Sequence, residues 1–316
     1  NITYNTIKVE PYKATGLYIF SSMRVACELV SLLSKEQVQA VELMDSRALN
    51  CVNKTDNKNK QQGYESNSAG LLIEFSAKSK NDLDDIESRL LNVIKRFDSH
   101  LQHSEPFTCD KNHIDELWRI RKGLFPAVGA NRTKGTTVVI EDVALPLSQL
   151  ADGVADLQQL FTTFNYNEAI IFGHALDGNL HFVFTQSFDE EKEVKRYESF
   201  MSSVSELVAI KYQGSLKAEH GTGRNMAPFV SLEWGEDIYH VMEQIKHLFD
   251  PTGILNPGVI INNDKNIHLK HLKKMPQADE VIDECIECGF CEPVCPSKNF
   301  TLTPRQRIAV WRQIQY

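Results

Sequence analysis

Apolar and polar positions in the middle of the chain alternate with two different periods. Residues 150–161 carry apolar side chains at helical spacing, and residues 189–212 form a longer amphipathic pattern with acidic residues in its first turn. Strand-like runs surround these helices at 136–146, 168–175, 180–188 and 215–220. The predicted order, β-α-β-β-α-β, is that of a ferredoxin-like unit.

The first hundred residues repeat this order more loosely. Strands are predicted at 16–20, 38–45 and 69–77, and helices at 21–33 and 81–97. We therefore predict an α+β chain made of two ferredoxin-like units side by side, each an antiparallel sheet backed by helices. Because a fold of this kind hosts many activities, function has to be argued from particular residues.

Composition narrows the classes of partner. The chain has 316 residues, enough for two domains, and its formal net charge of −8 at pH 7 argues against a nucleic-acid partner. No apolar run approaches the roughly 20 residues of a membrane span. The first ten residues contain no methionine and no signal pattern, so the start is interpreted as an internal cut. Four of the seven cysteines lie in the last tenth of the chain, which favours a reducing, cytoplasmic location and one metal cluster.

The stretch EAIIFGHALDGNLHFVF, residues 168–184, places two histidines on either side of an Asp-Gly pair. Asp177-Gly178 is a strong signal for a two-residue type I′ turn. That turn would set His174 directly opposite His181 on one face, with Cβ atoms about 5 Å apart. Two imidazoles at this separation are able to share a metal ion, which usually takes a third protein ligand. The hairpin alone leaves a second interpretation open, namely a hydrogen-bonded pair of structural histidines.

A second cluster of polar residues lies in KAEHGTGRNM, residues 217–226. Glu219 and His220 are adjacent, and Gly221 and Gly223 allow a sharp turn or a close approach to a ligand. In a regular strand the two side chains would face opposite ways, so that one could serve a metal and the other a second ligand. The alternative is a capped turn with an exposed acid and a structural histidine.

Three motifs in order carry a family resemblance: GHALDGNLHF, AEHGTGRNM and LFDPTGILNPGVI. They resemble the C-terminal substrate domain of FAD-linked oxidases, the family of flavin-dependent D-lactate and D-2-hydroxyglutarate dehydrogenases, over most of residues 10–262. The resemblance implies a divalent metal, zinc or manganese, held by His174, His181 and Glu219. It also implies a catalytic base at His220 and a contact of Asn256 with the flavin ring.

These residue types suit the oxidation of a 2-hydroxy acid. A Lewis-acidic metal lowers the pKa of the substrate hydroxyl, and a neutral imidazole such as His220 accepts its proton. A carboxylate substrate favours an arginine, whose planar fork binds it bidentately. The family's LWxxR pattern places that arginine at Arg121, and Arg132 with Lys134 lie in a loop from which they could reach a second carboxylate. Asp177 is the candidate acceptor for the outer nitrogen of a metal-bound imidazole.

Four closely spaced cysteines lie near the end of the chain: Cys285, Cys288, Cys291 and Cys295. Their C-x2-C-x2-C-x3-C-P spacing is that of bacterial ferredoxins and predicts a [4Fe-4S] cluster, since zinc sites normally show two separated pairs. One run leaves a cluster short of a ligand, so partner cysteines are expected beyond Tyr316. A helix is predicted from Thr303, with Pro304 at its first position and Gln306 completing a capping box.

The predicted organisation has four parts: residues 1–12 as a linker from a missing FAD-binding domain, 13–262 as the substrate domain, 263–283 as a linker, and 284–316 as the start of a small helical iron–sulfur domain. The chain would then be a fragment, inactive alone, of a D-2-hydroxyacid dehydrogenase of D-lactate or D-2-hydroxyglutarate type. It would pass hydride to FAD and electrons through iron–sulfur clusters to a quinone, cytochrome or other carrier. A basic stretch at 268–275 would allow peripheral contact with an anionic membrane. The alternative is a non-catalytic electron-transfer subunit that docks a flavoprotein.

Overall fold

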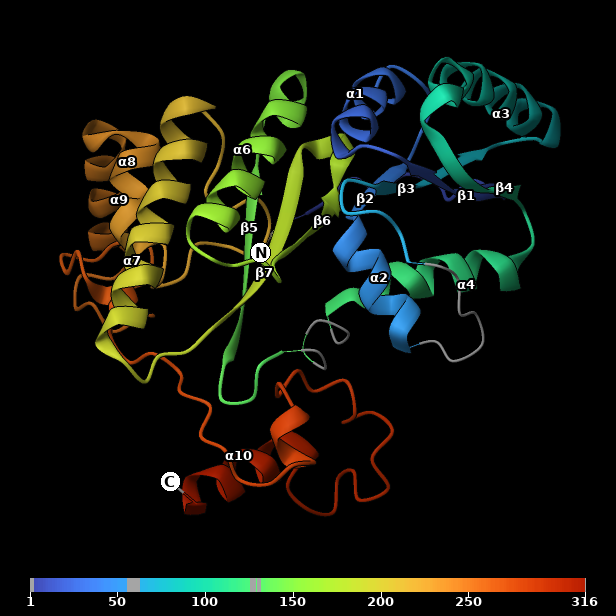
Figure 1. The fold of residues 1–316 in the computed structure, drawn as a ribbon. Coiled ribbons are helices and arrows are strands. Elements are labelled where there is room, and N and C mark those ends of the chain that lie inside the picture. The colour runs from blue at the N-terminus through green and yellow to red at the C-terminus, as the bar shows by residue number, and fades with distance from the viewer. Residues whose placement is uncertain (1–2, 56–62, 126–128, 130–131, 316) are drawn as a thin grey trace.

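The structure is a computed structural model that describes residues 3–55, 63–125, 129 and 132–315. Its central feature is a seven-stranded antiparallel sheet with strand order β4-β1-β3-β2-β6-β7-β5 (Figure 1). The two predicted units are halves of this one sheet, because β2 (Ala40–Asp45) pairs with β6 (Ile170–His174). Each of these strands would otherwise be an open edge of its own unit, and pairing satisfies its backbone groups. The α+β class is confirmed, and the two separate sheets are corrected to one.

The first half of the sheet has the ferredoxin-like strand order β4-β1-β3-β2. Its elements are β1 (Tyr12–Phe20), α1 (Met23–Leu33), β2, α2 (Ser46–Thr55), β3 (Ala69–Ala77), α3 (Lys80–Ile94) and β4 (Leu101–Thr108). The sequence pattern did not predict β4, because LQHSEPFT lacks alternating apolar positions and contains Pro106. A proline is tolerated there because β4 is an edge strand.

The second half repeats the order with one strand fewer. Its elements are β5 (Thr137–Ala144), α6 (Leu150–Thr163), β6, β7 (Asn179–Gln186) and α7 (Glu191–Ser205). The predicted fourth strand at 215–220 is wrong, because this segment keeps a single bridge, between Ser215 and Ala144. Beyond that bridge the N–H groups of Glu219 and His220 donate to the side chain of Asp142 instead of to a strand backbone.

The connection between β6 and β7 also differs from the prediction. Ala175–Asp177 form a 3-10 turn, and Gly178 follows with a φ of 65°. His181 is paired with Phe172, so His174 is not directly opposite His181, and the register is shifted by two residues. A shift of two residues preserves the face on which each side chain lies. The two histidines therefore still share a face.

Helices cover the two faces of the sheet unequally. One face packs against α1, α3, α6 and α7 around the larger apolar core, and the other packs against α2 and α4 (Lys111–Lys122) (Figure 1). Alternate strand residues enter opposite cores, so that Phe182 of β7 belongs to the larger core and Val183 to the smaller one. By the same alternation His181 lies on the α2–α4 face. The polar site described below lies on that less covered face.

The remainder of the chain contains α8 (Val230–Trp234), α9 (Glu236–Phe249) and α10 (Pro304–Gln315). The segment between α9 and α10 is irregular apart from short 3-10 turns, and with α10 it extends away from the sheet (Figure 1). The predicted capping box is confirmed, because Thr303 and Gln306 exchange hydrogen bonds of 2.9 and 3.3 Å.

Residues 3–10 of the expected N-terminal linker form neither helix nor strand. The first two residues of that linker, and the last residue of the expected iron–sulfur domain, lie outside the described residues. None of the helices in the described ranges has the length and apolar character needed to cross a lipid bilayer.

Candidate metal and substrate site

A row of polar side chains crosses the α2–α4 face where the strands β2, β6, β7 and β5 lie next to one another. Glu42 of β2 is paired with His174 of β6, and Asp142 of β5 is paired with His181 of β7. Glu42, His181 and Asp142 are only 3%, 4% and 0% exposed. Burying a polar group without a hydrogen-bonding partner costs free energy, so the contacts of these residues indicate which groups the row binds.

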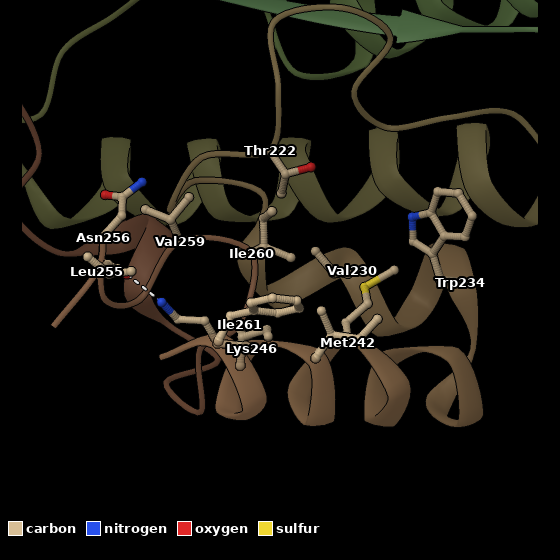
Figure 2. Close-up of a pocket in the computed structure, with 12 residues that line it drawn as sticks. Thr222, Val230, Trp234, Met242, Lys246, Leu255, Asn256, Val259, Ile260 and Ile261 are labelled. Atoms are coloured by element: carbon tan, nitrogen blue, oxygen red, sulfur yellow. Dashed lines mark hydrogen bonds between the residues drawn. The ribbon is translucent and has the colours of Figure 1, made fainter. Parts of the chain in front are cut away.

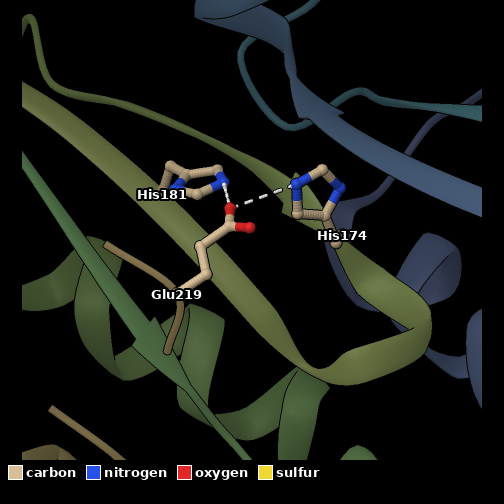
Figure 3. A group of neighbouring side chains, drawn as sticks. All are labelled: His174, His181 and Glu219. Carbon is tan, nitrogen blue, oxygen red and sulfur yellow. Dashed lines mark ion pairs between the residues drawn. The ribbon is translucent and has the colours of Figure 1, made fainter. Parts of the chain in front are cut away.

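Glu219 reaches this row from the irregular segment after Ser215. One of its carboxylate oxygens lies 3.2 Å from Nε2 of His174 and 3.0 Å from Nε2 of His181 (Figure 3). The three donor atoms all lie within 4.8 Å of one another. In the part of the chain that the structure describes, these residues form the one group of three or more histidine, cysteine or carboxylate side chains that converges in this way.

The donor set fits a divalent cation. Two imidazoles and a carboxylate form a known ligand set of catalytic zinc sites, where ligands about 2 Å from the metal lie about 3.3 Å from one another. The two distances from Glu219 already match that spacing. Burial lowers the pKa of His181 to about 4, so this imidazole is neutral, as a metal ligand must be.

The outer nitrogen of His174 has a partner that the sequence interpretation did not find. Nδ1 of His174 lies 2.6 Å from Glu42, so Asp177 is not the acceptor, and Nε2 is left to face the donor set. The hydrogen bond to Glu42 raises the pKa of His174. Nδ1 of His181 is buried without a partner among the described residues. The carboxylate therefore orients one of the two imidazoles.

Arg121 meets the same glutamate from α4. Its Nε donates to the second oxygen of Glu42 at 2.7 Å, and its guanidinium lies 4.5 Å above the ring of Phe172. Although burial raises the pKa of Glu42, the hydrogen bond from His174 and the charge of Arg121 outweigh it and leave that pKa below its usual value. One ionised carboxylate thus connects the predicted substrate arginine to the predicted metal ligand.

His220 lies on the other side of the donor set. Its ring is stacked on that of His181, with centroids 4.9 Å apart and planes 16° from parallel. The backbone N–H groups of Glu219 and His220 both donate to Asp142, at 2.6 and 3.1 Å. The adjacent acid and histidine therefore reach one site, because this segment does not follow the strict alternation of a regular strand.

Asn256 lines an apolar groove of about 620 Å³ beside the segment that carries His220. Thr222, two residues after His220, lines the same groove, together with Trp234 of α8 and Lys246 of α9 (Figure 2). Asn256 has a φ of 45°, a left-handed conformation that asparagine tolerates better than most residues. Its contact with a flavin remains a prediction.

Arg132 is not available for a second carboxylate. Arg132 donates to five carbonyl oxygens, three of them in residues 283–285, and the guanidinium has only five N–H donors. Lys134 donates to the carbonyl of Glu280 over 3.4 Å, a contact that uses one of the three N–H donors of its ammonium group. Both residues contact the segment that leads into the cysteine run. For Arg132 this corrects the expectation that it reaches a substrate, whereas the expectation for Lys134 stays a prediction.

Among the described residues, the four cysteine thiols near the end of the chain do not meet as the ligands of a single metal ion, whose donor atoms would lie within 4.8 Å of one another. Cys285 accepts a hydrogen bond from the N–H of Glu287, and Cys295 contacts Ser297 and Arg307. Hydrogen bonds from Ser297 lower the pKa of the Cys295 thiol. The cysteine sulfurs around a cubane lie farther apart than the ligands of a single ion, so the [4Fe-4S] cluster stays a prediction from the cysteine spacing.

Two carboxylates in this site, Glu42 and Asp142, were missed by the sequence analysis. Both lie in strands that are otherwise largely apolar, AVELMD and TVVIEDVA. Acidic residues are rarely fully buried without a partner, so acids inside such an apolar run are themselves a signal of a polar site. Each lies beside a histidine only through pairing between distant strands, which local patterns do not show.

The fold and the donor set together define an α+β domain that presents the ligands of a candidate metal site beside a partly buried arginine. Residues 9–260 match the family described as FAD linked oxidases, C-terminal domain, and the chain belongs to that family. The expected family is thereby confirmed.

Solved structures share the fold. A p-cresol methylhydroxylase with bound substrate aligns with a TM-score of 0.56 and 13% identity over 80% of this chain and 53% of its own. A 4-ethylphenol oxidase from Gulosibacter chungangensis aligns with a TM-score of 0.55 and 12% identity over 81% of this chain and 55% of its own.

Curated relatives include the mitochondrial D-lactate dehydrogenase (cytochrome) of Kluyveromyces lactis, 26% identical over 84% of this chain and 44% of the relative. The D-2-hydroxyglutarate dehydrogenase of Haemophilus influenzae is 25% identical over 98% of this chain and 33% of the relative. The chain therefore spans less than half the length of these relatives.

Proposed function

We propose that this chain is the substrate-binding part of an FAD-dependent dehydrogenase that oxidises a D-2-hydroxy acid. The observation that carries the proposal is the convergence of His174, His181 and Glu219 next to Arg121. Relatives named D-lactate dehydrogenase and D-2-hydroxyglutarate dehydrogenase support this substrate class.

Each residue has a separate task in this proposal. A divalent cation, zinc or manganese, held by His174, His181 and Glu219 supplies Lewis acidity that lowers the pKa of the substrate hydroxyl. Bound FAD supplies the acceptor for the hydride that leaves Cα. Arg121, held at Nε by Glu42, binds the substrate carboxylate through its Nη groups. His220 accepts the hydroxyl proton, and Asn256 lies at the flavin side of the groove.

The electron outlet is a separate part of the proposal. The spacing of Cys285, Cys288, Cys291 and Cys295 supports a [4Fe-4S] cluster, and the relative from Haemophilus influenzae aligns with nearly the whole chain, this segment included. Iron and acid-labile sulfide analysis of the full-length protein tests this part, and a quinone, cytochrome or other carrier is the proposed acceptor.

Flavin bleaching tests the activity directly. The full-length protein is mixed anaerobically with D-lactate, D-2-hydroxyglutarate and other D-2-hydroxy acids, and the flavin absorbance is followed, with the L enantiomers as controls. We expect bleaching by a D acid, loss of bleaching after chelation, and recovery with added zinc or manganese. No bleaching with any hydroxy acid would contradict the proposal and favour a non-catalytic docking subunit.

A further inference from the structure

The segment that carries Glu219 and His220 is held by side chains instead of by strand pairing. After the bridge between Ser215 and Ala144, the backbone leaves the edge of β5. From that point the N–H groups of Glu219 and His220 donate to Asp142 of β5, and the side chain of Lys217 donates to Glu141 of the same strand. These acids therefore determine where the two predicted functional residues lie.

Asp142 is the central member of this group. It is fully buried, and its Oδ2 accepts hydrogen bonds from the backbone N–H of Glu219 at 2.6 Å and of His220 at 3.1 Å. Its Oδ1 lies 3.3 Å from Nδ1 of the His220 ring and 3.3 Å from Nζ of Lys217. The same carboxylate thus touches both the backbone and the ring of His220.

Glu141, the second acid of the pair, shares the ion pair of Asp142 with Lys217. Lys217, whose side chain is 8% exposed, forms ion pairs with both Glu141 and Asp142. The other oxygen of Glu141 accepts a hydrogen bond from Asn225. One buried ammonium therefore compensates two adjacent carboxylates, and such buried ionic groups are retained only when they are well paired.

We propose that Asp142 is the positioning residue of the base. Its Oδ1, 3.3 Å from Nδ1 of His220, favours the ring proton on that nitrogen, so that the lone pair of Nε2 is available for the substrate proton. Its Oδ2 fixes the peptide of Glu219 at the same time. This inference rests on the proposed function of His220. In the reaction the hydroxyl proton moves to Nε2, the hydride moves from Cα to bound FAD, and the product is a 2-oxo acid. The resulting imidazolium is stabilised by the adjacent carboxylate, as in a Ser-His-Asp triad.

Asp142→Asn tests this role in the full-length protein. The amide keeps one oxygen for the two backbone donors, but it presents an NH2 group toward Nδ1 of His220. The ring proton is then favoured on Nε2, where it blocks proton uptake. We expect kcat to fall by about 10²- to 10⁴-fold, because the equivalent change in a Ser-His-Asp triad costs about 10⁴-fold. The KM for the hydroxy acid and the metal content should change by less than about threefold, because Arg121 and the donor set are retained.

Asp45 offers a matched control. It is a buried aspartate that likewise accepts two backbone hydrogen bonds, from Ala48 at 2.7 Å and Ile171 at 2.8 Å. Asp45→Asn should therefore cost similar stability while leaving kcat within about threefold of wild type. If both variants lose kcat equally, Asp142 has only a structural role and the proposal is overturned.

A second measurement does not depend on turnover. Histidine-selective ¹⁵N NMR of the wild-type protein reports which ring nitrogen carries the proton, and His220→Gln assigns the signal. We expect a proton on Nδ1 of His220, and finding it on Nε2 would overturn the proposal even if Asp142→Asn does not fold. If the wild type oxidises no hydroxy acid, the proposed function fails, whereas the NMR result still decides whether Asp142 orients His220.

Discussion

The two halves of the sheet share an element order but use their last segment differently. In the first half β4 pairs with β1 along much of its length, from Thr15 opposite Thr108 to Phe20 opposite Leu101. In the second half the corresponding segment keeps only the bridge at Ser215. The backbone N–H groups released in this way are bound by Asp142. A functional segment therefore lies where a structural strand would otherwise run.

The first half nevertheless supplies part of the site. Glu42 at its inner edge contacts His174 across the β2–β6 pair, and it also contacts Arg121 of α4. The site thus depends on the junction of the two halves as well as on the second half. The first half stabilises and orients, while the second half provides the ligands and the base. Each of the predictions below tests this division.

Removing one of the predicted metal ligands, all of which lie in the second half, should have the largest effect, on turnover. We expect His181→Ala to lower turnover of the full-length protein by on the order of 10³-fold, because a Lewis acid contributes several kcal/mol and each 1.4 kcal/mol is about tenfold. Metal content, measured by mass spectrometry, should fall with turnover, and flavin content should not change. His113→Ala is the control, because His113 is a half-buried residue of α4 whose ring lies 3.7 Å from Glu105. Undiminished turnover in His181→Ala would make the hairpin histidines structural residues only.

Changing Glu42, the glutamate that the first half contributes to the site, should have the next largest effect, on metal affinity. Both oxygens of Glu42 accept hydrogen bonds, so Glu42→Gln leaves an NH2 group facing either His174 or Arg121. We expect metal affinity to fall by about 10- to 100-fold, as is typical when the partner of a metal-bound histidine is lost. The KM for the hydroxy acid should rise as well. Metal titration followed by calorimetry, with steady-state kinetics, measures both changes.

Glu74 provides the matched control for that variant. It is a buried glutamate of β3 whose carboxylate accepts hydrogen bonds from Lys13, Thr15 and Trp118. Glu74→Gln should destabilise the fold by about 1–3 kcal/mol, because it leaves a buried donor without its acceptor. Its metal affinity should stay near that of wild type. Equal losses of affinity in the two variants would mean that Glu42 has no specific role at the site.

The fold was largely predictable because its main elements are strongly periodic. The helices α6 and α7 and the strands β5 and β7 were expected from apolar spacing alone. The pairing of β2 with β6 was not, because it joins two edges that are distant in sequence and local patterns do not report such contacts. The hairpin register was wrong by two residues because the chain makes a 3-10 turn before Gly178.

The site was predictable only in part. His174, His181 and Glu219 were named through a family resemblance, since the topology expected for Glu219 did not bring it to the hairpin. Glu42 is 132 residues from His174, so no local motif could connect them. The role expected for Arg132 failed because its guanidinium is fully used by backbone carbonyls, which depends on the path of residues 283–285.

The turn between β6 and β7 should be more sensitive to substitution than an open glycine of similar conformation. A Cβ at Gly178 would lie 1.9 Å from the carbonyl oxygen of Leu145, whereas a Cβ at Gly253 would meet nothing within 4 Å. Both glycines have positive φ, 65° and 67°, so alanine at either costs about 1–2 kcal/mol. We expect Gly178→Ala to lose about 1–3 kcal/mol more in free energy of unfolding, because of the overlap. If chemical denaturation shows equal losses of unfolding free energy in the two variants, the backbone of the turn adapts to the added Cβ and the turn does not help to place His174.

The smallest expected effect is the change that His181→Ala causes in the stability of the apolar core of the first half. Cys27 of α1 is 1% exposed, and burial raises the pKa of its thiol to about 12, so it reacts with a thiol reagent only after the core opens. If the halves divide their tasks, His181→Ala should change the labelling rate of Cys27 by less than about twofold, because labelling follows the opening free energy of its own region. Mass spectrometry measures this rate, the exposed Cys109 corrects for reagent strength, and Ile73→Ala in β3 serves as a variant that should accelerate labelling. Acceleration in His181→Ala comparable to that in Ile73→Ala would show that both halves open as one unit, so that the first half is not an independent support for the site.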